Sequence, residues 1–334
     1  MHKRIAVLAT AMLALGVGTA VPATAAAKTC TWQVSKVSTP AGYLERSTTV
    51  TGTDSHGNYS GTTGSVATDA AIPLLWTNGQ PRVADELSDF RYPQVVDENS
   101  DGTILVSGTQ QSTGRSGAFL FRNGHSGHGT LTNLPTPDGY VTDYATALNE
   151  RGDVLAHGHA VRDGHEVSLY WSTLAAGPIV IDTPYGEGID LDDDGTVLLY
   201  DGADHPAHLW RHGQVIPVAA EYPTLFRAIR NGTVIGTKVE SPWPESQSLL
   251  WREPGTARAI DNGGTAQAIN AHGLIAGSKG ALVGPPAVWS GTTYLADLPL
   301  PAGISDDSDV YVIGDDNTIF GRVSDYGPLK WNCA

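Results

Sequence analysis

The chain has 334 residues, with 35 Asp and Glu against 20 Lys and Arg, and its formal net charge at pH 7 is −15. Such an acidic surface argues against nucleic acid or an anionic membrane as a partner, because both carry negative charge themselves. Glycine (39) and proline (20) are plentiful, and the apolar residues alternate or run in short groups. This pattern predicts an all-β protein with many tight turns.

The N-terminus reads as an export signal. Residues 2–4 are basic in sum, residues 5–21 are apolar, and residues 22–27 are mostly small. A secretory signal peptide over residues 1–27, cleaved near Ala25 to Ala27, is therefore predicted. The apolar run is short for a membrane span and no second one follows. We expect a secreted, extracellular protein without a membrane span, monomeric, with a single domain over residues 28–334.

The remainder of the chain is a repeat with a period of about 42 residues, which is typical of a β-propeller blade. Bulky aromatic residues mark it, and these are Trp76, Phe121, Trp171, Trp210, Trp251, Trp289 and Trp331. An Asn/Asp-x-x-Gly turn recurs upstream of them, at residues 54–57, 99–102, 149–152, 192–195 and 270–273. Seven units account for the chain after the signal, so we predict a seven-bladed β-propeller of four-stranded antiparallel blades.

The third unit shows how one blade is expected to fold. Residues 144–148 form the innermost strand, and residues 149–152 its turn, in which Asn149 bonds the backbone two residues on and Gly152 supplies a positive φ. Residues 153–157, 167–171 and 178–182 follow as the second, third and fourth strands. Trp171 on the third strand is expected to pack between neighbouring blades.

A motif at the N-terminus indicates how the ring closes. It reads Val34-x-x-Val37-x-x-Pro40, and it matches Leu131-x-x-Leu134-x-x-Pro137 and Leu295-x-x-Leu298-x-x-Pro301. The second and third copies follow a blade aromatic, which makes the motif an outermost strand. The first copy has no blade before it, and the chain stops after Trp331 with this strand missing. The N-terminal segment is therefore predicted to complete the last blade, which leaves no inner sheet edge exposed.

Cys30 and Cys333 are the two cysteines of the chain, and they lie at the two ends of this predicted cut. We predict a disulfide that replaces the missing turn between strands three and four. An exported protein meets the oxidising conditions in which such a bond persists. On the chain-entropy account, closing a loop of this length stabilises the fold by roughly 5 kcal/mol.

The repeat resembles a known family. Residues 268–277 (AINAHGLIAG), 287–291 (AVWSG) and 295–299 (LADLP) look like the HAF-type "probable extracellular repeat" found in exported bacterial proteins of the kind common in actinobacteria. The resemblance covers most of the mature chain, and it is clear in blades 3 and 6 and degenerate in blades 2, 4, 5 and 7. It implies a propeller fold and an extracellular location, and it implies no chemistry.

Two acidic turns are candidate calcium sites. They contain Asp97, Asn99 and Asp101 in one blade, and Asp190, Asp192 and Asp194 in another. Carboxylates at alternate positions of a loop can converge on a hard cation. The bidentate Glu of an EF-hand is absent from both, and other blades use the same turn with Asn149 or Asn270. An ordinary hairpin with extra solvated acid explains the pattern as well.

Tyrosines recur in the loops that leave one blade and enter the next, at Tyr43, Tyr92, Tyr140, Tyr185 and Tyr222. These loops are expected to gather around one mouth of the central channel. A Tyr offers a flat apolar ring and a hydroxyl, which suits a sugar or a protein surface. Packing of each Tyr against its own blade corner remains the alternative.

Histidines cluster in blades 3 and 4, at His157, His159, His165, His205, His208 and His212. His157 and His159 are expected on the same side of a strand. With Asp163, Glu166 or Asp204 they could bind zinc or another transition metal, although surface or turn roles are commoner.

No nucleophile motif or His-Glu-x-x-His zinc motif is present. A propeller enzyme can still assemble a site from several blades, and Asp306, Asp307 and Asp309 with Arg227 or Arg230 are candidates for one. The sequence favours a non-catalytic binding module that holds a glycan or a protein on the Tyr-bearing loops. The alternatives are a lyase or hydrolase acting at the channel mouth on an extracellular carbohydrate or small molecule, and a surface-interaction protein without a small ligand.

Overall fold

The computed structural model describes residues 30–65, 71–173, 175, 177–220, 224–239, 246–304 and 308–333. It divides into two units, residues 1–30 and residues 31–334. The predicted signal peptide lies outside the described residues. Among those residues, no helix is long and apolar enough to cross a membrane.

The described residues form seven four-stranded antiparallel sheets, together with two short 3-10 helices at Asp85–Leu87 and Gly124–Ser126. The innermost strands are β2 (Tyr43–Thr53), β6 (Phe90–Glu98), β10 (Tyr140–Leu148), β14 (Glu187–Leu191), β18 (Thr224–Arg230), β22 (Gly263–Ile269) and β26 (Ser308–Ile313). The second strands are β3 (Tyr59–Ser65), β7 (Ile104–Gln110), β11 (Val154–Ala160), β15 (Val197–Tyr200), β19 (Thr233–Val239), β23 (Leu274–Lys279) and β27 (Ile319–Val323).

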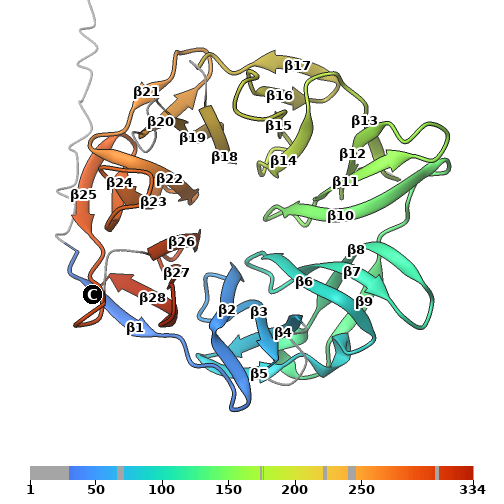
Figure 1. The fold of residues 1–334 in the computed structure, drawn as a ribbon. Helices are drawn as coiled ribbons and strands as arrows, with labels where there is room; N and C mark the ends of the chain where they lie inside the picture. Colours follow the sequence, from blue (N-terminus) through green and yellow to red (C-terminus); the bar gives the residue numbers. More distant parts are fainter. Residues whose placement is uncertain are drawn as a thin grey trace, which may run out of the picture. The chain divides into compact units, whose positions relative to one another are not determined.

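The third strands are β4 (Ala71–Thr77), β8 (Arg115–Arg122), β12 (Glu166–Trp171), β16 (His208–Arg211), β20 (Ser246–Arg252), β24 (Pro286–Ser290) and β28 (Gly327–Cys333). The outermost strands are β5 (Gln80–Val83), β9 (Thr130–Asn133), β13 (Ile179–Ile181), β17 (Gln214–Pro217), β21 (Arg258–Ala259), β25 (Thr293–Asp297) and β1 (Trp32–Lys36). The blades stand side by side around a central axis, with the innermost strands facing it (Figure 1). The predicted seven-bladed propeller is confirmed.

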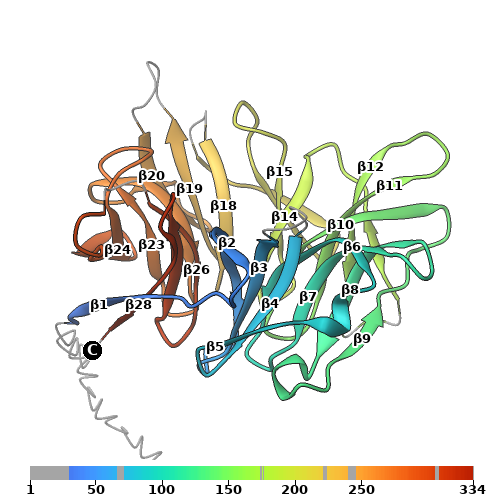
Figure 2. The ribbon, with the colours of Figure 1, turned by 60° about the horizontal axis from the view of Figure 1, so that its bottom comes forward.

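The ring closes as the N-terminal motif predicts. Strand β1 pairs antiparallel with β28, and Val34 lies opposite Trp331. The last sheet therefore has the order β1-β28-β27-β26, with its outermost strand taken from the start of the chain. Figures 1 and 2 show this blue strand beside the red strands of the last blade. Cys30 and Cys333 form the predicted disulfide, next to the pair formed by Trp32 and Cys333.

The recurring aromatic residues all lie on third strands, and each is at most 8% exposed. Several of the tryptophans bind the blade before their own. Trp171 donates its indole N–H to the carbonyl oxygen of Pro135 at 2.9 Å, and Trp331 donates to Pro299 at 2.7 Å. Pro135 and Pro299 follow the outermost strands β9 and β25 of the preceding blades. The sequence period therefore marks interblade packing, because one large ring per repeat fills the gap between two twisted sheets.

Each innermost strand also contains a β-bulge at the same level. A register shift separates Val95 from Asp97 in β6 and Gly188 from Asp190 in β14, and the other five innermost strands shift at the equivalent place. A bulge places two residues opposite one and turns a side chain away from the regular alternation. Here it turns one side chain per blade towards the axis of the ring.

Candidate functional site

The bulged level of the seven innermost strands encloses a polar hollow of about 260 Å³ on the axis. The bulged residues that line it are Thr51, Val96, Thr146, Ile189, Arg227, Gln267 and Tyr311. Side chains from all seven blades meet here, so this is where the fold brings residues from the whole chain together. We call it the central hollow.

Asp97 and Asp190 occupy the position after the bulge in blades 2 and 4, and both line the central hollow. Burial raises the pKa of Asp97 to about 8 and the pKa of Asp190 to about 6. Each carboxylate accepts a backbone N–H from another blade. Asp190 Oδ2 lies 2.7 Å from the nitrogen of Ile229, while Asp97 Oδ2 lies 3.4 Å from that of Leu148. The hydrogen bonds and Arg230 lower both pKa values, but loss of water around the carboxylates outweighs them.

The Asn/Asp turns at the far ends of the innermost strands tie several blades to the next. Asn149 holds its own turn, because its Oδ1 accepts the backbone N–H groups of Arg151 and Asp153 at 3.1 and 2.9 Å. Its Nδ2 meanwhile donates to the carbonyl oxygen of Asp192 in blade 4 at 3.0 Å. Asn99 donates to Asn149 in the same way, at 3.3 Å. The local turn that the sequence predicts is thus also an interblade contact.

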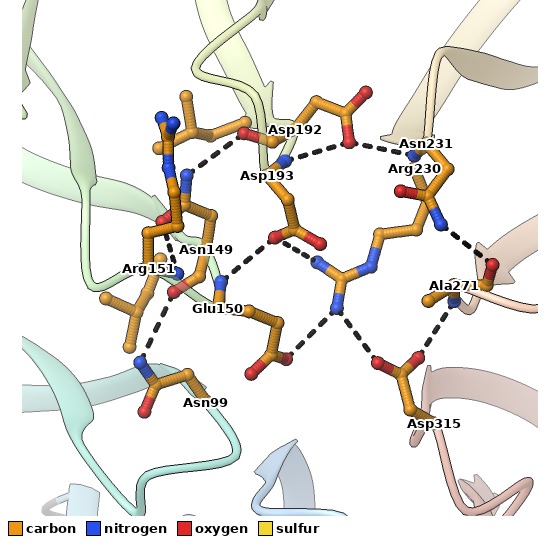
Figure 3. A network of polar contacts seen from close by, with 12 residues as sticks. Asn99, Asn149, Glu150, Arg151, Asp192, Asp193, Arg230, Asn231, Ala271 and Asp315 are labelled. Atoms are coloured by element: carbon orange, nitrogen blue, oxygen red, sulfur yellow. Dashed lines mark hydrogen bonds and ion pairs between the residues drawn. The ribbon is translucent and has the colours of Figure 1, made fainter.

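Arg230 forms ion pairs with three carboxylates of this turn face (Figure 3). Its guanidinium lies 3.1 Å from Asp193, 3.0 Å from Glu150 and 3.4 Å from Asp315. The Arg230 side chain is 15% exposed. Three carboxylates from blades 3, 4 and 7 therefore share one cation from blade 5, and the surrounding carboxylates raise the pKa of Arg230 above its ordinary value against the effect of burial. The turn face is a linked network in which Glu150, Asp193 and Asp315 share one partner.

The six residues of the predicted calcium turns take separate places. Asp97 and Asp190 face the central hollow, and Asp101 is exposed. Asn99 Oδ1 accepts the N–H of Thr103 at 3.1 Å within its own turn. Asp192 accepts the N–H groups of the next blade's turn, at Asn231 and Gly232, at 2.8 and 2.6 Å, and Asp194 accepts that of Thr196 at 2.8 Å. These hydrogen bonds account for the carboxylates as structural acceptors, and calcium binding at the turns stays a prediction.

The predicted Tyr residues lie at or near the starts of the innermost strands, at the end of the ring opposite the turns. We call this end the Tyr-bearing face. Tyr92 is 70% exposed and Tyr185 is 41% exposed, while Tyr43 and Tyr140 are half-buried. Tyr140 packs against the core of blade 3. Tyr92 and Tyr140 line separate hollows rather than a shared one, and Tyr222 lies outside the described residues.

The six histidines do not form one cluster. His165 pairs with Asp182 at 2.8 Å, and His205 lies 3.4 Å from Asp201; both histidines are exposed. The His208 ring packs against the Tyr185 ring, with the two ring centroids 4.2 Å apart. His157 and His159 share one side of β11, as predicted, and His159 binds Asp143 at 2.8 Å.

The aspartates and arginines predicted as an enzyme site do not all lie together. Arg227 and Arg230 line the central hollow, whereas Asp309 is exposed at the start of β26. Asp306 and Asp307 lie outside the described residues. The sequence reasoning missed that Asp97 and Asp190 face the hollow. One signal was present, because other blades carry Gly52, Ala147 or Ala268 two residues before the turn where these two carry Asp.

No protein-family model and no curated protein matches this chain. Among solved structures, it is similar to the β-propeller domain of the Trilobed protease from Pyrococcus furiosus, with a TM-score of 0.51 and 11% identity over 78% of this chain and 84% of that one. Prolyl oligopeptidase B from Galerina marginata also has a TM-score of 0.51 and 11% identity, over 87% of this chain and 46% of that one. TolB from Acinetobacter baumannii has a TM-score of 0.47 and 12% identity, over 72% of this chain and 62% of that one.

At these identities the likeness shows the fold alone, which is a β-propeller. The Pyrococcus domain is described as having an open velcro topology. The present ring differs in this respect, because β1 and β28 come from the two ends of the chain and pair within one sheet.

Proposed function

We propose that this protein is an exported, non-catalytic binding propeller that holds a protein ligand on its Tyr-bearing face. The observation that carries the proposal is where the exposed apolar side chains lie. Eight large apolar residues are exposed among those described, and six belong to this end of the ring. These six are Tyr92, Val141, Tyr144, Val161, Tyr185 and Val283. Exposed apolar groups gathered at one end of a rigid scaffold favour an interaction surface.

The turn face fits this role less well. Its Asn and Asp side chains bind the next blade, and its carboxylates share Arg230. A ligand there would have to displace hydrogen bonds that join the blades. On the Tyr-bearing face, Tyr92 and Val161 are 70% and 63% exposed, which leaves their apolar surface available for a partner.

The chemistry of the face favours a protein over a glycan. Val141 and Val161 present aliphatic carbon beside the tyrosines, which suits the apolar side chains of a protein. Carboxylates also lie at this end, among them Asp143 and Asp163. A partner surface that combines basic and apolar side chains complements this arrangement. Export of the chain and its membership of the HAF-type repeat family are parts of the same proposal, and the disulfide supports the first of them.

Capture experiments with matched variants test the proposed face. The disulfide-intact protein is immobilised beside Tyr92→Ala and Val161→Asp, with Leu295→Ala as control, because Leu295 is 45% exposed on the outermost strand β25. We expect the wild type and Leu295→Ala to retain the same protein from culture medium, and both face variants to lose it. Retention by all four, or by none, contradicts the proposal. A glycan array is run alongside. Specific binding to a sugar on the array also contradicts the proposal of a protein ligand.

One observation favours a second candidate, an enzyme acting at the central hollow. Asp97 and Asp190 have raised pKa values, and they share that hollow with Arg227. Carboxylates tuned towards neutrality in a cavity are typical of general acid–base catalysis. An enzyme of this kind would lose turnover of an extracellular carbohydrate in Asp97→Asn and Asp190→Asn. Equal turnover in wild type and both variants eliminates this candidate.

A further inference from the structure

His157 lies at the junction of blades 3 and 4 with both ring nitrogens unsatisfied. Its side chain is 8% exposed, and neither nitrogen makes a hydrogen bond of acceptable geometry. Carboxylates are nevertheless close. Nε2 is 3.1 Å from Glu187 Oε1, and Nδ1 is 3.6 Å from Asp143 Oδ2. A buried imidazole normally has a partner for its polar atoms, so this side chain calls for an explanation.

Glu166 completes a group of three around this imidazole. One nitrogen of His157 and one oxygen each of Glu166 and Glu187 all lie within 4.8 Å of one another. Within the described parts of the chain, this is the one group of three or more His, Cys, Asp and Glu residues gathered so closely.

The fold accounts for the meeting of these three residues. Glu166 on β12 pairs with His159, two residues along β11 from His157, so their side chains share one side of the sheet. Blade 4 supplies Glu187 at the start of β14. The Ser168 hydroxyl, which lies opposite His157, accepts the backbone N–H of Gly188 at 2.7 Å and so holds Glu187 over the imidazole.

The electrostatics of the junction favour a cation. Three carboxylates, Asp143, Glu166 and Glu187, stand around two histidines, His157 and His159.

Tyr144 lies against the same group of residues. Its ring stacks on His157 with the centroids 4.9 Å apart, and its hydroxyl donates to Glu187 Oε2 at 3.2 Å. A divalent ion would neutralise the excess negative charge and give the imidazole nitrogen a partner.

We propose that His157, Glu166 and Glu187 bind a divalent transition-metal ion of the zinc class. One imidazole nitrogen and two carboxylates match the ligands that Zn²⁺ takes, whereas Ca²⁺ prefers oxygen ligands alone. Nε2 faces Glu187 and acts as the ligand, and Asp143 adds negative charge on the Nδ1 side of the ring. Tyr144 holds the free oxygen of Glu187. Three protein ligands leave the fourth tetrahedral position open for water or for a group of a bound partner.

Calorimetric titration of the chelator-treated, disulfide-intact protein with Zn²⁺ alone tests the site. Glu166→Gln and Glu187→Gln keep the size of each side chain and remove its charge, and Glu166 is exposed, so the first variant at least is expected to fold. His165→Gln is the matched control, because His165 pairs with Asp182 at 2.8 Å on the same blade but lies outside the group of three. Co²⁺ absorption in the visible range reports the coordination geometry, because four-coordinate Co²⁺ absorbs more strongly than the hydrated ion.

We expect one Zn²⁺ per chain in the wild type and in His165→Gln, with affinity reduced more than about tenfold in both glutamine variants. A matching loss of the Co²⁺ bands in these two variants supports the assigned ligands. Absence of saturable binding in the wild type overturns the proposal and leaves His157 as an ion-paired structural residue. Binding that survives in both glutamine variants, or that fails in His165→Gln as well, places the ion elsewhere and overturns it too.

Discussion

Arg230 of blade 5 donates a hydrogen bond to Glu150 of blade 3, with 3.0 Å between Nη2 and Oε1. The same guanidinium reaches Asp193 of blade 4 and Asp315 of blade 7. Residues that are far apart in the sequence and on four different blades are thus joined by one side chain (Figure 3). The contact holds the turn face of the ring together where the innermost strands end.

Replacement of Arg230 is therefore expected to destabilise the whole ring. Arg230→Ala leaves three half-buried carboxylates facing one another without their cation, and removing one partner of such a cluster costs roughly 2–4 kcal/mol in the free energy of unfolding. Urea denaturation measures the change. Arg162→Ala is the control, because the Arg162 side chain is 90% exposed and pairs with its neighbour Asp163; no measurable change is expected there. Equal losses in the two variants would show that the network does not stabilise the ring.

The raised pKa of Asp97, about 8, makes stability depend on pH. An unfolded Asp titrates near 3.9, so the folded state binds the proton more tightly than the unfolded state does. The stabilising contribution is complete below that unfolded pKa, and it is lost as the pH rises towards 8. Asp97→Asn stays neutral and keeps an oxygen to accept the N–H of Glu98. We expect it to match the wild type near pH 4 and to melt at a higher temperature than the wild type at pH 8.

Melting curves across this pH range check the prediction for Asp97. The exposed Asp101, in the turn that follows it, provides the control as Asp101→Asn. This variant should follow the wild-type curve at every pH. A higher melting temperature for the wild type than for Asp97→Asn at pH 8 would show that the ionised carboxylate stabilises the fold, contrary to the burial argument.

The Cys30–Cys333 disulfide closes a loop that contains the entire ring. Its removal in a Cys30→Ser/Cys333→Ser variant should lower the free energy of unfolding by up to roughly 5 kcal/mol, because the unfolded chain regains its freedom. The β1–β28 pairing is expected to persist, so the circular dichroism spectrum of the folded state should not change. Reducing agent should weaken the wild type and leave the double variant unaffected. A wild type that is equally stable in both conditions would contradict the prediction.

Two buried tryptophans separate the effect of a hydrogen bond from that of packing. Trp289 donates its indole N–H to the carbonyl oxygen of Asp261 at 2.8 Å, whereas the indole nitrogen of Trp251 has no hydrogen-bond partner among the described residues. Both side chains are buried on third strands. Trp289→Phe should therefore cost about 1–2 kcal/mol more than Trp251→Phe, because it leaves a carbonyl unpaired. Urea denaturation measures the free energy of unfolding of both variants. An equal loss in the two would show that the smaller ring, and not the hydrogen bond, accounts for the destabilisation.

Much of the architecture could be predicted because it depends on short-range patterns. The aromatic period located the third strands, and the Asn149 turn located the end of an innermost strand. The match of Val34 with Leu131 and Leu295 identified the strand that closes the ring. Each of these signals repeats within the chain, so one blade supports the interpretation of the next. The repeat was less informative about function, because a ligand site depends on where blades differ.

The candidate sites depended on contacts that no local pattern encodes. The sequence placed Asp97 and Asp190 in turns, as candidate calcium ligands, and the structure places both directly after a bulge, in the lining of the central hollow. It placed His157 with Glu166, but Glu187 comes from the next blade.

The sequence by itself determined the number of blades, the order of the strands and the ring closure, because hydrophobic period and turn chemistry act over a few residues. Only the tertiary structure decided which polar side chains face the axis, which bind a neighbouring blade and which remain exposed. The physical reason is that register shifts and interblade distances are set by the packing of seven twisted sheets against one another. Burial and charge at each site follow from that packing.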